Sequence, residues 1–207
     1  YLDDGNIAVM KLGEELKVVN ILNEELSPEV RTVDINLGQI EKGGFPHFML
    51  KEIFAQPECL KNCMRGLVHP EHNQVTLSAL IDHRNELLNA KRIIIVACGT
   101  SYNAGWVGKE LFEQLAGIPV EVHLASEFAY HQPLLSQKPF FIFLSQSGET
   151  ADSRQALVKV NEQNYPSLTI TNVKGSTLSR EATYTLLLHA GPEIAVASTK
   201  AYTAQIT

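Results

Sequence analysis

Residues 92–98, RIIIVAC, and residues 140–144, FFIFL, are short apolar runs, and small hydroxyl residues and glycine follow each of them. A short continuous apolar run rich in β-branched or aromatic side chains is typical of a strand that is buried on both faces. The stretches that follow, GTSYNAG (99–105) and SQSGETADS (145–153), predict loops that lead into helices. Strand, loop and helix in this order form the repeating unit of a parallel α/β fold.

The same alternation continues to the end of the chain. Strands that alternate with helices imply a parallel sheet with right-handed crossovers, and so a doubly wound α/β domain. We expect a five-stranded sheet with strands at 92–98, 120–124, 140–144, 168–172 and 184–189. The expected helices lie at 106–115, after SQSGETADS (145–153) through residue 161, at 175–182 and from 198 onward.

The first third of the chain has a different pattern. Two short β-type runs, around 7–10 and 17–22, predict a hairpin. A polar connector over 36–46 leads to a helix at 48–65, which we expect to be interrupted or restarted at Pro57. An amphipathic pattern predicts a second helix over 77–90. The α/β domain is therefore preceded by a helical segment and a short β portion.

Composition excludes several classes of protein. The 207 residues include 17 Lys and Arg against 23 Asp and Glu, so the net charge of −6 offers no basic footprint for nucleic acid. No apolar run approaches the roughly 20 residues of a membrane helix, and the N-terminus does not resemble a signal peptide. We expect a cytoplasmic location. The chain does not begin with Met, which suggests a fragment or a processed chain.

Three cysteines leave two interpretations open. Cys59 and Cys63 are four residues apart on one face of an expected helix, and His69 and His72 lie in a proline-broken loop. A metal site would need more ligands close by. Reduced thiols with a structural role are the simpler interpretation, with Cys98 as a small buried apolar residue.

The two loops after the first and third expected strands are candidate anion sites. Ligands of open parallel sheets bind beyond the carboxyl ends of the strands, where helix N-termini offer backbone N–H groups. Neither 99–103 nor 145–150 contains Lys or Arg, which favours a phosphate monoester held by neutral donors. The dinucleotide and P-loop motifs and the GxSxG motif are all missing. Simple helix capping by Ser and Thr is the alternative for each loop.

A third segment, GPEIAVASTK (191–200), follows the fifth expected strand and leads into a helix. Its small residues allow the backbone to approach a ligand closely. Lys200 could look catalytic, but we expect it to face solvent or to pair with a nearby Glu. Glu149 would repel a phosphate if it faced inward, so we expect it to point away or to assist ring opening in an intact enzyme.

Several of these motifs together resemble one family. CGTSYNAG (98–105), SQSGETADS (145–153) and EIAVASTKAYTAQ (193–205) resemble the first sugar isomerase (SIS) domain of the glutamine–fructose-6-phosphate aminotransferases. EKGGFPHFMLKEIFAQP (41–57) is similar to the family's link between its glutaminase and isomerase parts. The resemblance implies a remnant of the glutaminase domain over 1–32, a linker and helical segment over 33–76, and a flavodoxin-like SIS domain over 77–207.

The resemblance also implies a function. The family converts fructose 6-phosphate and glutamine to glucosamine 6-phosphate and glutamate, in the synthesis of UDP-N-acetylglucosamine. It implies a hexose 6-phosphate ligand (fructose 6-phosphate or glucosamine 6-phosphate), a homodimer, and no metal, organic cofactor, nucleic acid or membrane partner. The positions that match sugar-phosphate-binding residues are Thr100, Ser101, Ser145, Gln146, Ser147, Thr150, Val196 and Ser198. One departure is Ala195, where the family often has Gly.

The resemblance assigns no catalytic residue to this stretch. The family's glutaminase nucleophile is an N-terminal cysteine, and its isomerase residues lie mainly in a second SIS domain and a C-terminal tail. We therefore expect this chain alone to be inactive. Alternatives are a sugar-phosphate-sensing SIS module of a regulator, which would normally follow a helix-turn-helix segment, and a nucleotide-binding oxidoreductase, which the missing fingerprint disfavours.

Overall fold

The computed structural model describes residues 2–28, 40–135 and 139–207, and the chain forms two compact units, Tyr1–Asn36 and Leu37–Thr207. The smaller unit holds an antiparallel sheet of three short strands in the order β1 (Asn6–Val9), β2 (Lys17–Asn20) and β3 (Glu25–Leu26). The predicted hairpin is present as β1 and β2, and β3 extends it. The domain boundary expected at residue 32 lies outside the described residues, and the boundary expected at residue 76 remains a prediction.

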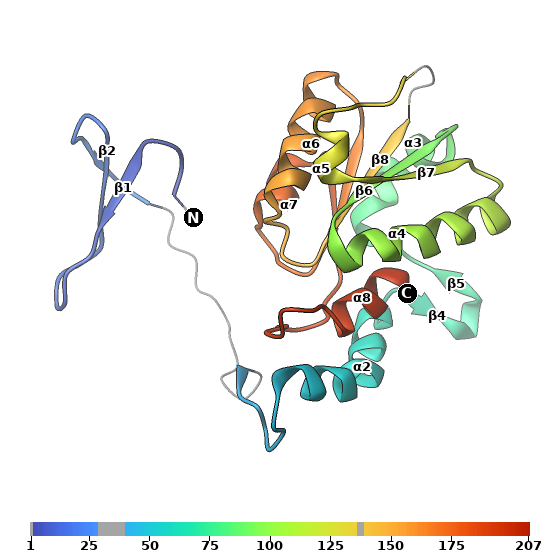
Figure 1. Ribbon diagram of the computed structural model, residues 1–207, viewed down its shortest axis with the longest axis horizontal. Helices are drawn as coiled ribbons and strands as arrows, with labels where there is room; N and C mark the ends of the chain where they lie inside the picture. Colours follow the sequence, from blue (N-terminus) through green and yellow to red (C-terminus); the bar gives the residue numbers. More distant parts are fainter. Residues whose placement is uncertain (1, 29–39, 136–138) are drawn as a thin grey trace. The chain divides into compact units, whose positions relative to one another are not determined.

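The larger unit is built on a five-stranded parallel sheet, as predicted (Figure 1). Its strands are β6 (Ile93–Ala97), β7 (Val120–Leu124), β8 (Phe140–Ser145), β9 (Ser167–Thr171) and β10 (Tyr184–Leu187). The spatial order is β10-β9-β8-β6-β7. In order of sequence this is 5-4-3-1-2, the flavodoxin-like arrangement, whose switch point lies between β6 and β8.

Helices cover both faces of this sheet because alternate strand residues face opposite sides. Ile93 and Ile95 pack in one core cluster with Ala104 of α4 (Gly99–Leu111). Ile94 and Val96 pack in the other cluster. That second cluster also holds side chains of α5 (Ala125–Phe128), α6 (Ala151–Glu162) and α7 (Thr177–Glu181). The central strands are buried on both sides, which explains their uninterrupted apolar sequence.

A separate small core joins two distant helices. It contains Cys59 and Cys63 of α2 (Phe48–Met64), Leu188 and Ala190, and Ala204 of α8 (Lys200–Ile206). Helices α2 and α8 pack against each other through this core. The helical segment ahead of the α/β domain is therefore part of the larger unit.

Three predicted helices have different bounds in the structure. Helix α4 begins at Gly99, seven residues before the expected Trp106, so the hydroxyl residues form its first turn. Helix α2 continues through Pro57, because its face with Cys59 and Cys63 is held by the core with α8. The segment expected as one helix over 77–90 is a 3-10 turn, η2 (Ser78–His83), followed by the short α3 (Arg84–Leu88).

The remaining elements are short. Strands β4 (Val68–His69) and β5 (Gln74–Val75) pair around the 3-10 turn η1 (Pro70–His72). Helix α4 ends in a π-helical turn, η3 (Phe112–Ala116). Within the described ranges, no helix is both long enough and apolar enough to span a lipid bilayer.

Candidate functional site

Two helices begin side by side at the carboxyl edge of the sheet. Strand β6 leads directly into α4, and β8 leads through residues 146–150 into α6. Because β6 and β8 are neighbours in the sheet, the starts of α4 and α6 lie at the same edge. The N-cap residues Cys98 and Thr150 make no side-chain capping bond. The first-turn N–H groups are therefore not capped by these side chains, and the helix dipoles favour an anion there.

The hydroxyl groups of the β8–α6 loop bond to one another and to the loop backbone. The Ser145 side chain is buried, and its Oγ accepts the Gly148 N–H at 3.0 Å and lies 3.0 Å from Thr150 Oγ1. Ser147 Oγ accepts the Glu149 N–H at 3.1 Å. Because Ser147 uses a lone pair in that bond, its own O–H can still donate to a ligand.

The loop is also tied to the neighbouring strand ends. The Gln146 carbonyl oxygen accepts the Asn172 N–H at 3.1 Å and the Thr171 hydroxyl at 3.3 Å. The Asn172 side chain in turn donates to Gly191 O at 2.7 Å and accepts the Ala190 N–H at 2.9 Å. Asn172 thus joins the β8–α6 loop to the segment after β10. Asn172 ends the strand expected at 168–172, and this position in the sequence does not indicate its role in the site.

Ser101 of α4 is linked to α8. Its side chain is buried, and Gln205 Nε2 donates to Ser101 Oγ at 3.0 Å. With one lone pair used, the Ser101 hydroxyl can direct its proton elsewhere. Thr100, one residue earlier in the same turn, is half-buried. Gln205 lies 104 residues beyond Ser101, so no local sequence pattern indicates this contact.

Glu149 points toward α7, in agreement with the expectation that it faces away from a phosphate. Its carboxylate accepts the Thr177 N–H at 2.9 Å and the Thr177 hydroxyl at 2.6 Å, at the first residue of that helix. The negative charge therefore stabilises the positive end of α7.

The segment from 193 to 199 is held by two carboxylates. Glu193 accepts the Ser198 hydroxyl at 2.8 Å and the Thr199 N–H at 2.8 Å. Glu52 of α2 accepts the N–H groups of Ile194 and Ala195. Between these anchors the Val196 side chain is fully exposed.

Lys200 is buried, in contrast to the expectation that it faces solvent or pairs with a nearby Glu. Its relative exposure is 8%, and in the described part of the chain it forms no ion pair. It lies at the start of α8, and the packing of this helix against α2 removes it from water.

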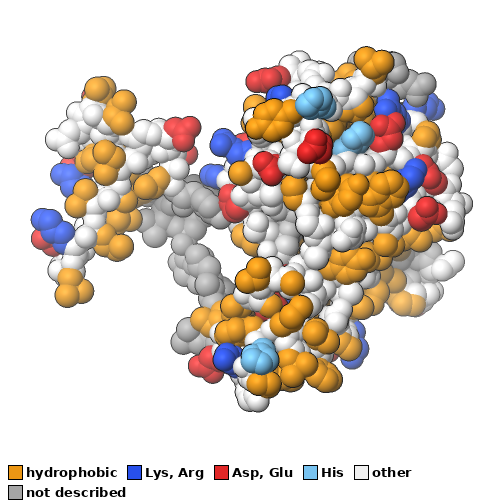
Figure 2. All heavy atoms as spheres, viewed as in Figure 1, with side chains coloured by type: hydrophobic (Ala, Val, Ile, Leu, Met, Phe, Trp, Pro, Cys, Tyr) orange, Lys and Arg blue, Asp and Glu red, His pale blue; other side chains and the backbone are white. Residues whose placement is uncertain are grey.

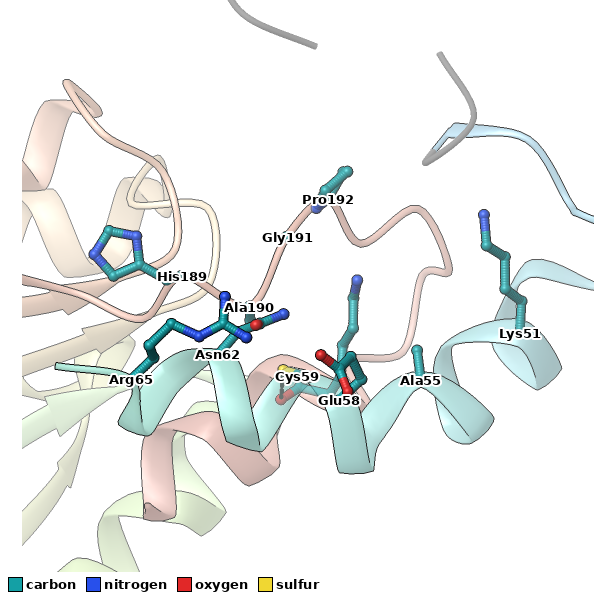
Figure 3. A pocket seen from close by; sticks show the side chains of 11 residues that line it. Lys51, Ala55, Glu58, Cys59, Asn62, Arg65, His189, Ala190, Gly191 and Pro192 are labelled. Atoms are coloured by element: carbon teal, nitrogen blue, oxygen red, sulfur yellow. Dashed lines mark hydrogen bonds between the residues drawn. The ribbon is translucent and has the colours of Figure 1, made fainter. Parts of the chain in front are cut away.

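A pocket of about 710 Å³ lies beside Lys200, between α2 and the segment 189–192. Figure 3 shows Ala55, Glu58, Asn62 and Arg65 along α2, with His189 and Pro192 across from them. Cys59 also lines this pocket. Burial, together with the neighbouring Cys63, raises the pKa of the Cys59 thiol from 9.0 to about 12, so this thiol is neutral and unreactive at ordinary pH.

Comparison with known proteins gives a consistent result. The SIS domain family model matches residues 86–207. The chain is 53% identical over 207 residues to a glutamine–fructose-6-phosphate aminotransferase (isomerizing) of Bacteroides thetaiotaomicron. It is 57% identical over 205 residues to the protein of the same name from Lactiplantibacillus plantarum. It covers 34% and 33% of these two proteins, so it spans about a third of their length.

Solved structures of other proteins share the fold of the larger unit. The C-terminal domain of glucosamine-fructose-6-phosphate aminotransferase from Francisella tularensis superimposes with a TM-score of 0.74 at 42% identity. This match covers 80% of the present chain and 46% of the other. Tagatose-6-phosphate ketose/aldose isomerase from Escherichia coli shares the fold, with a TM-score of 0.62 at 19% identity over 78% of this chain and 45% of that one.

Proposed function

Because the chain belongs to the SIS domain family, we propose that it binds a hexose 6-phosphate as the isomerase part of a longer glutamine–fructose-6-phosphate aminotransferase. In that reaction fructose 6-phosphate and glutamine give glucosamine 6-phosphate and glutamate. The high identity to two proteins of this name supports the proposal.

One structural observation carries the proposal. Two helices begin at adjacent strands, at the switch point of the sheet, and hydroxyl residues lie at or just before each start, although α6 also carries Asp152 in its first turn. A phosphate monoester placed there would receive N–H and O–H donors from both sides, with no cationic side chain from 99–103 or 145–150. Such a site suits a phosphate that is bound and released unchanged, while the reaction takes place at the sugar carbons.

The individual roles follow from the hydrogen bonds. Ser101 and Ser147 each accept a bond from the protein, so each can donate its hydroxyl proton to a phosphate oxygen. Ser145 and Thr150 fix the shape of the loop between them. Thr100 and Gln146 are proposed to complete the phosphate contacts. Val196 and Ser198 are proposed to contact the sugar, from the segment held by Glu52 and Glu193.

The chemistry of isomerisation needs a general base within hydrogen-bonding distance of the sugar carbons. Glu149 and Glu193 carry the carboxylates of the candidate loops, and both are engaged with backbone N–H groups. We therefore propose that this stretch binds and orients the substrate, and that the groups that move protons and nitrogen belong to other parts of the longer protein.

Titration calorimetry with fructose 6-phosphate tests this proposal. Ser147→Ala removes one hydroxyl donor to a charged group, and we expect binding to weaken by about 1.5–3 kcal/mol. Ser78→Ala, at an exposed serine of η2, is the matched control and should leave the affinity unchanged. Equal affinities of Ser147→Ala and the unaltered chain would contradict the site.

Association and location are further parts of the proposal. Large apolar side chains are exposed on α2 and α4, among them Phe54, Trp106 and Leu111, and Figure 2 shows apolar side chains gathered over the face where these helices lie. We propose that a homodimer or a further domain covers this surface. The three free cysteines fit a reducing compartment, the cytoplasm.

A further inference from the structure

The Glu52 side chain makes an unusual contact for a carboxylate on a helix. It is 3% exposed, and its Oε1 accepts the N–H groups of Ile194 at 2.6 Å and Ala195 at 3.1 Å. These two residues lie 142 and 143 positions further along the chain. The contact therefore joins α2 to the segment that follows β10.

Those two N–H groups are the hydrogen-bond donors that this buried carboxylate has in the described ranges. In the described ranges no Lys, Arg or His forms an ion pair with Glu52, and its Oε2 is buried without a hydrogen-bond partner. A buried carboxylate is costly unless it is hydrogen-bonded. The two backbone donors are the interactions that offset this cost, so the position of residues 194–195 and that of Glu52 depend on each other.

The other end of the same segment is held separately. Glu193 accepts four bonds from Ser198, Thr199 and Ala201, at the start of α8. Residues 196 and 197 between the two anchors are exposed. The backbone is thus fixed on both sides of a short stretch whose own side chains are free to meet a ligand.

We propose that Glu52 is a positioning residue that fixes residues 194–198 in the shape needed to contact the sugar of a bound hexose phosphate. The ligand part of this inference depends on the function proposed above, whereas the anchoring part does not. Glu52 belongs to α2, which precedes the family match at 86–207, so the part of the chain that forms the sugar-binding site includes α2.

The loop proposed to bind the phosphate is held independently of Glu52. The loop at 145–150 is held by its own hydroxyl groups and by Asn172 and Thr171, and in the described part of the chain no hydrogen bond joins these groups to Glu52. Loss of the Glu52 carboxylate should therefore weaken contacts to the sugar and leave contacts to the phosphate intact.

Three variants of the full chain test this. Glu52→Leu removes the acceptor, Glu52→Gln keeps an oxygen that can accept both N–H bonds, and Glu58→Leu is a control at an exposed position of the same helix. Hydrogen–deuterium exchange followed by mass spectrometry measures the protection of residues 193–199. Calorimetry measures the affinities for fructose 6-phosphate and for inorganic phosphate.

For Glu52→Leu we expect faster exchange at 193–199 with unchanged exchange in β8 and α6. We also expect the affinity for fructose 6-phosphate to fall by up to about tenfold, and the affinity for inorganic phosphate to stay unchanged. Glu52→Gln and Glu58→Leu should behave like the unaltered chain in both measurements.

Two results would overturn the inference. Unchanged exchange at 193–199 in Glu52→Leu would show that Glu52 does not anchor the segment. Equal loss of affinity for both ligands, with faster exchange throughout the sheet, would show a general effect on folding. If the unaltered chain binds neither ligand, the proposed function fails, and the exchange measurement still decides whether Glu52 anchors the segment.

Discussion

Gly148 occupies a position that has room for a hydrogen atom but not for a methyl group. Its φ of +67° is in the left-handed region, and a Cβ at this residue would lie 2.0 Å from Ser176 Oγ and 2.9 Å from Thr171 Oγ1. The turn between β8 and α6 can therefore approach the ends of β9 and α7 only with glycine here.

We expect Gly148→Ala to lower the free energy of unfolding by about 2–4 kcal/mol, from backbone strain and overpacking together. Gly117→Ala is the matched control, because Gly117 has a φ of +66° and nothing within 4 Å of a new Cβ. Gly117→Ala should lower the free energy of unfolding by about 1 kcal/mol, from backbone strain alone. Urea unfolding of both variants measures the difference, and equal costs would show that crowding by Ser176 is unimportant.

The buried thiols of α2 make stability depend on pH. Burial raises the pKa of both Cys59 and Cys63 above 9.0, and that of Cys59 reaches about 12. Above pH 9 the unfolded chain therefore loses thiol protons that the folded chain keeps, so the free energy of unfolding should fall as pH rises from 9.

Denaturant titrations at pH 8, 9 and 10 test this expectation. Cys59→Ala combined with Cys63→Ala should remove most of the decrease, although the double variant is less stable at every pH. Iodoacetamide at pH 8 should modify Cys98, which is half-buried, before either thiol of α2. A faster reaction at Cys59 would contradict the raised pKa.

The contact between α4 and α8 determines how the Ser101 hydroxyl is oriented. Gln205 donates to Ser101 Oγ, and its own Oε1 is buried without a partner in the described part of the chain. Without that donor, the Ser101 hydroxyl would be free to rotate away from the start of α4.

We expect Gln205→Leu to weaken fructose 6-phosphate binding about threefold to tenfold, with little change in melting temperature. Gln114→Leu, at an exposed position of η3, is the control and should have no effect on binding. Affinity equal to that of the unaltered chain would mean that Ser101 is oriented by other groups.

The strands of the larger sheet could be predicted from sequence because each depends on local pattern alone. Ile93–Ala97 and Phe140–Ser145 are central strands that are buried on both faces, so their sequences are apolar apart from the last residue of the second strand, Ser145. Helix α4 begins earlier than the sequence predicts because Gly99 and Ser101 are weak helix formers, and tertiary packing overrides that preference.

The site was only partly predictable. Ser145 and Thr150 lie in one loop, so sequence places them together. Glu52 and Gln205 act across more than 100 residues, so the sequence next to each of them does not reveal its hydrogen-bond partner. One signal was available for Glu52: it lies seven residues before Cys59, on the helix face that also carries Cys63.

The larger unit should need its N-terminal helices for its full stability. Leu80, Cys59 and Cys63 belong to its cores and precede the family match. We expect a chain trimmed to 40–207 to keep the melting temperature of this unit, because the smaller unit is a separate compact body.

A chain trimmed to 86–207 should lose about 4 kcal/mol or more, from the loss of these three buried side chains alone. Circular dichroism with thermal unfolding compares the two trimmed chains. Equal melting temperatures would mean that α2 and η2 contribute little to the stability of the sheet.

The uncharged donors at the starts of α4 and α6 bear on how ligand affinity depends on pH. Residues 99–103 and 145–150 contain no histidine, the side chain that ordinarily changes charge between pH 5 and 8. The pH profile of affinity in that range should therefore follow the phosphate monoester itself, which takes up its second proton near a pH of about 6. In such a site the ligand, rather than the protein, carries the sensitivity to pH.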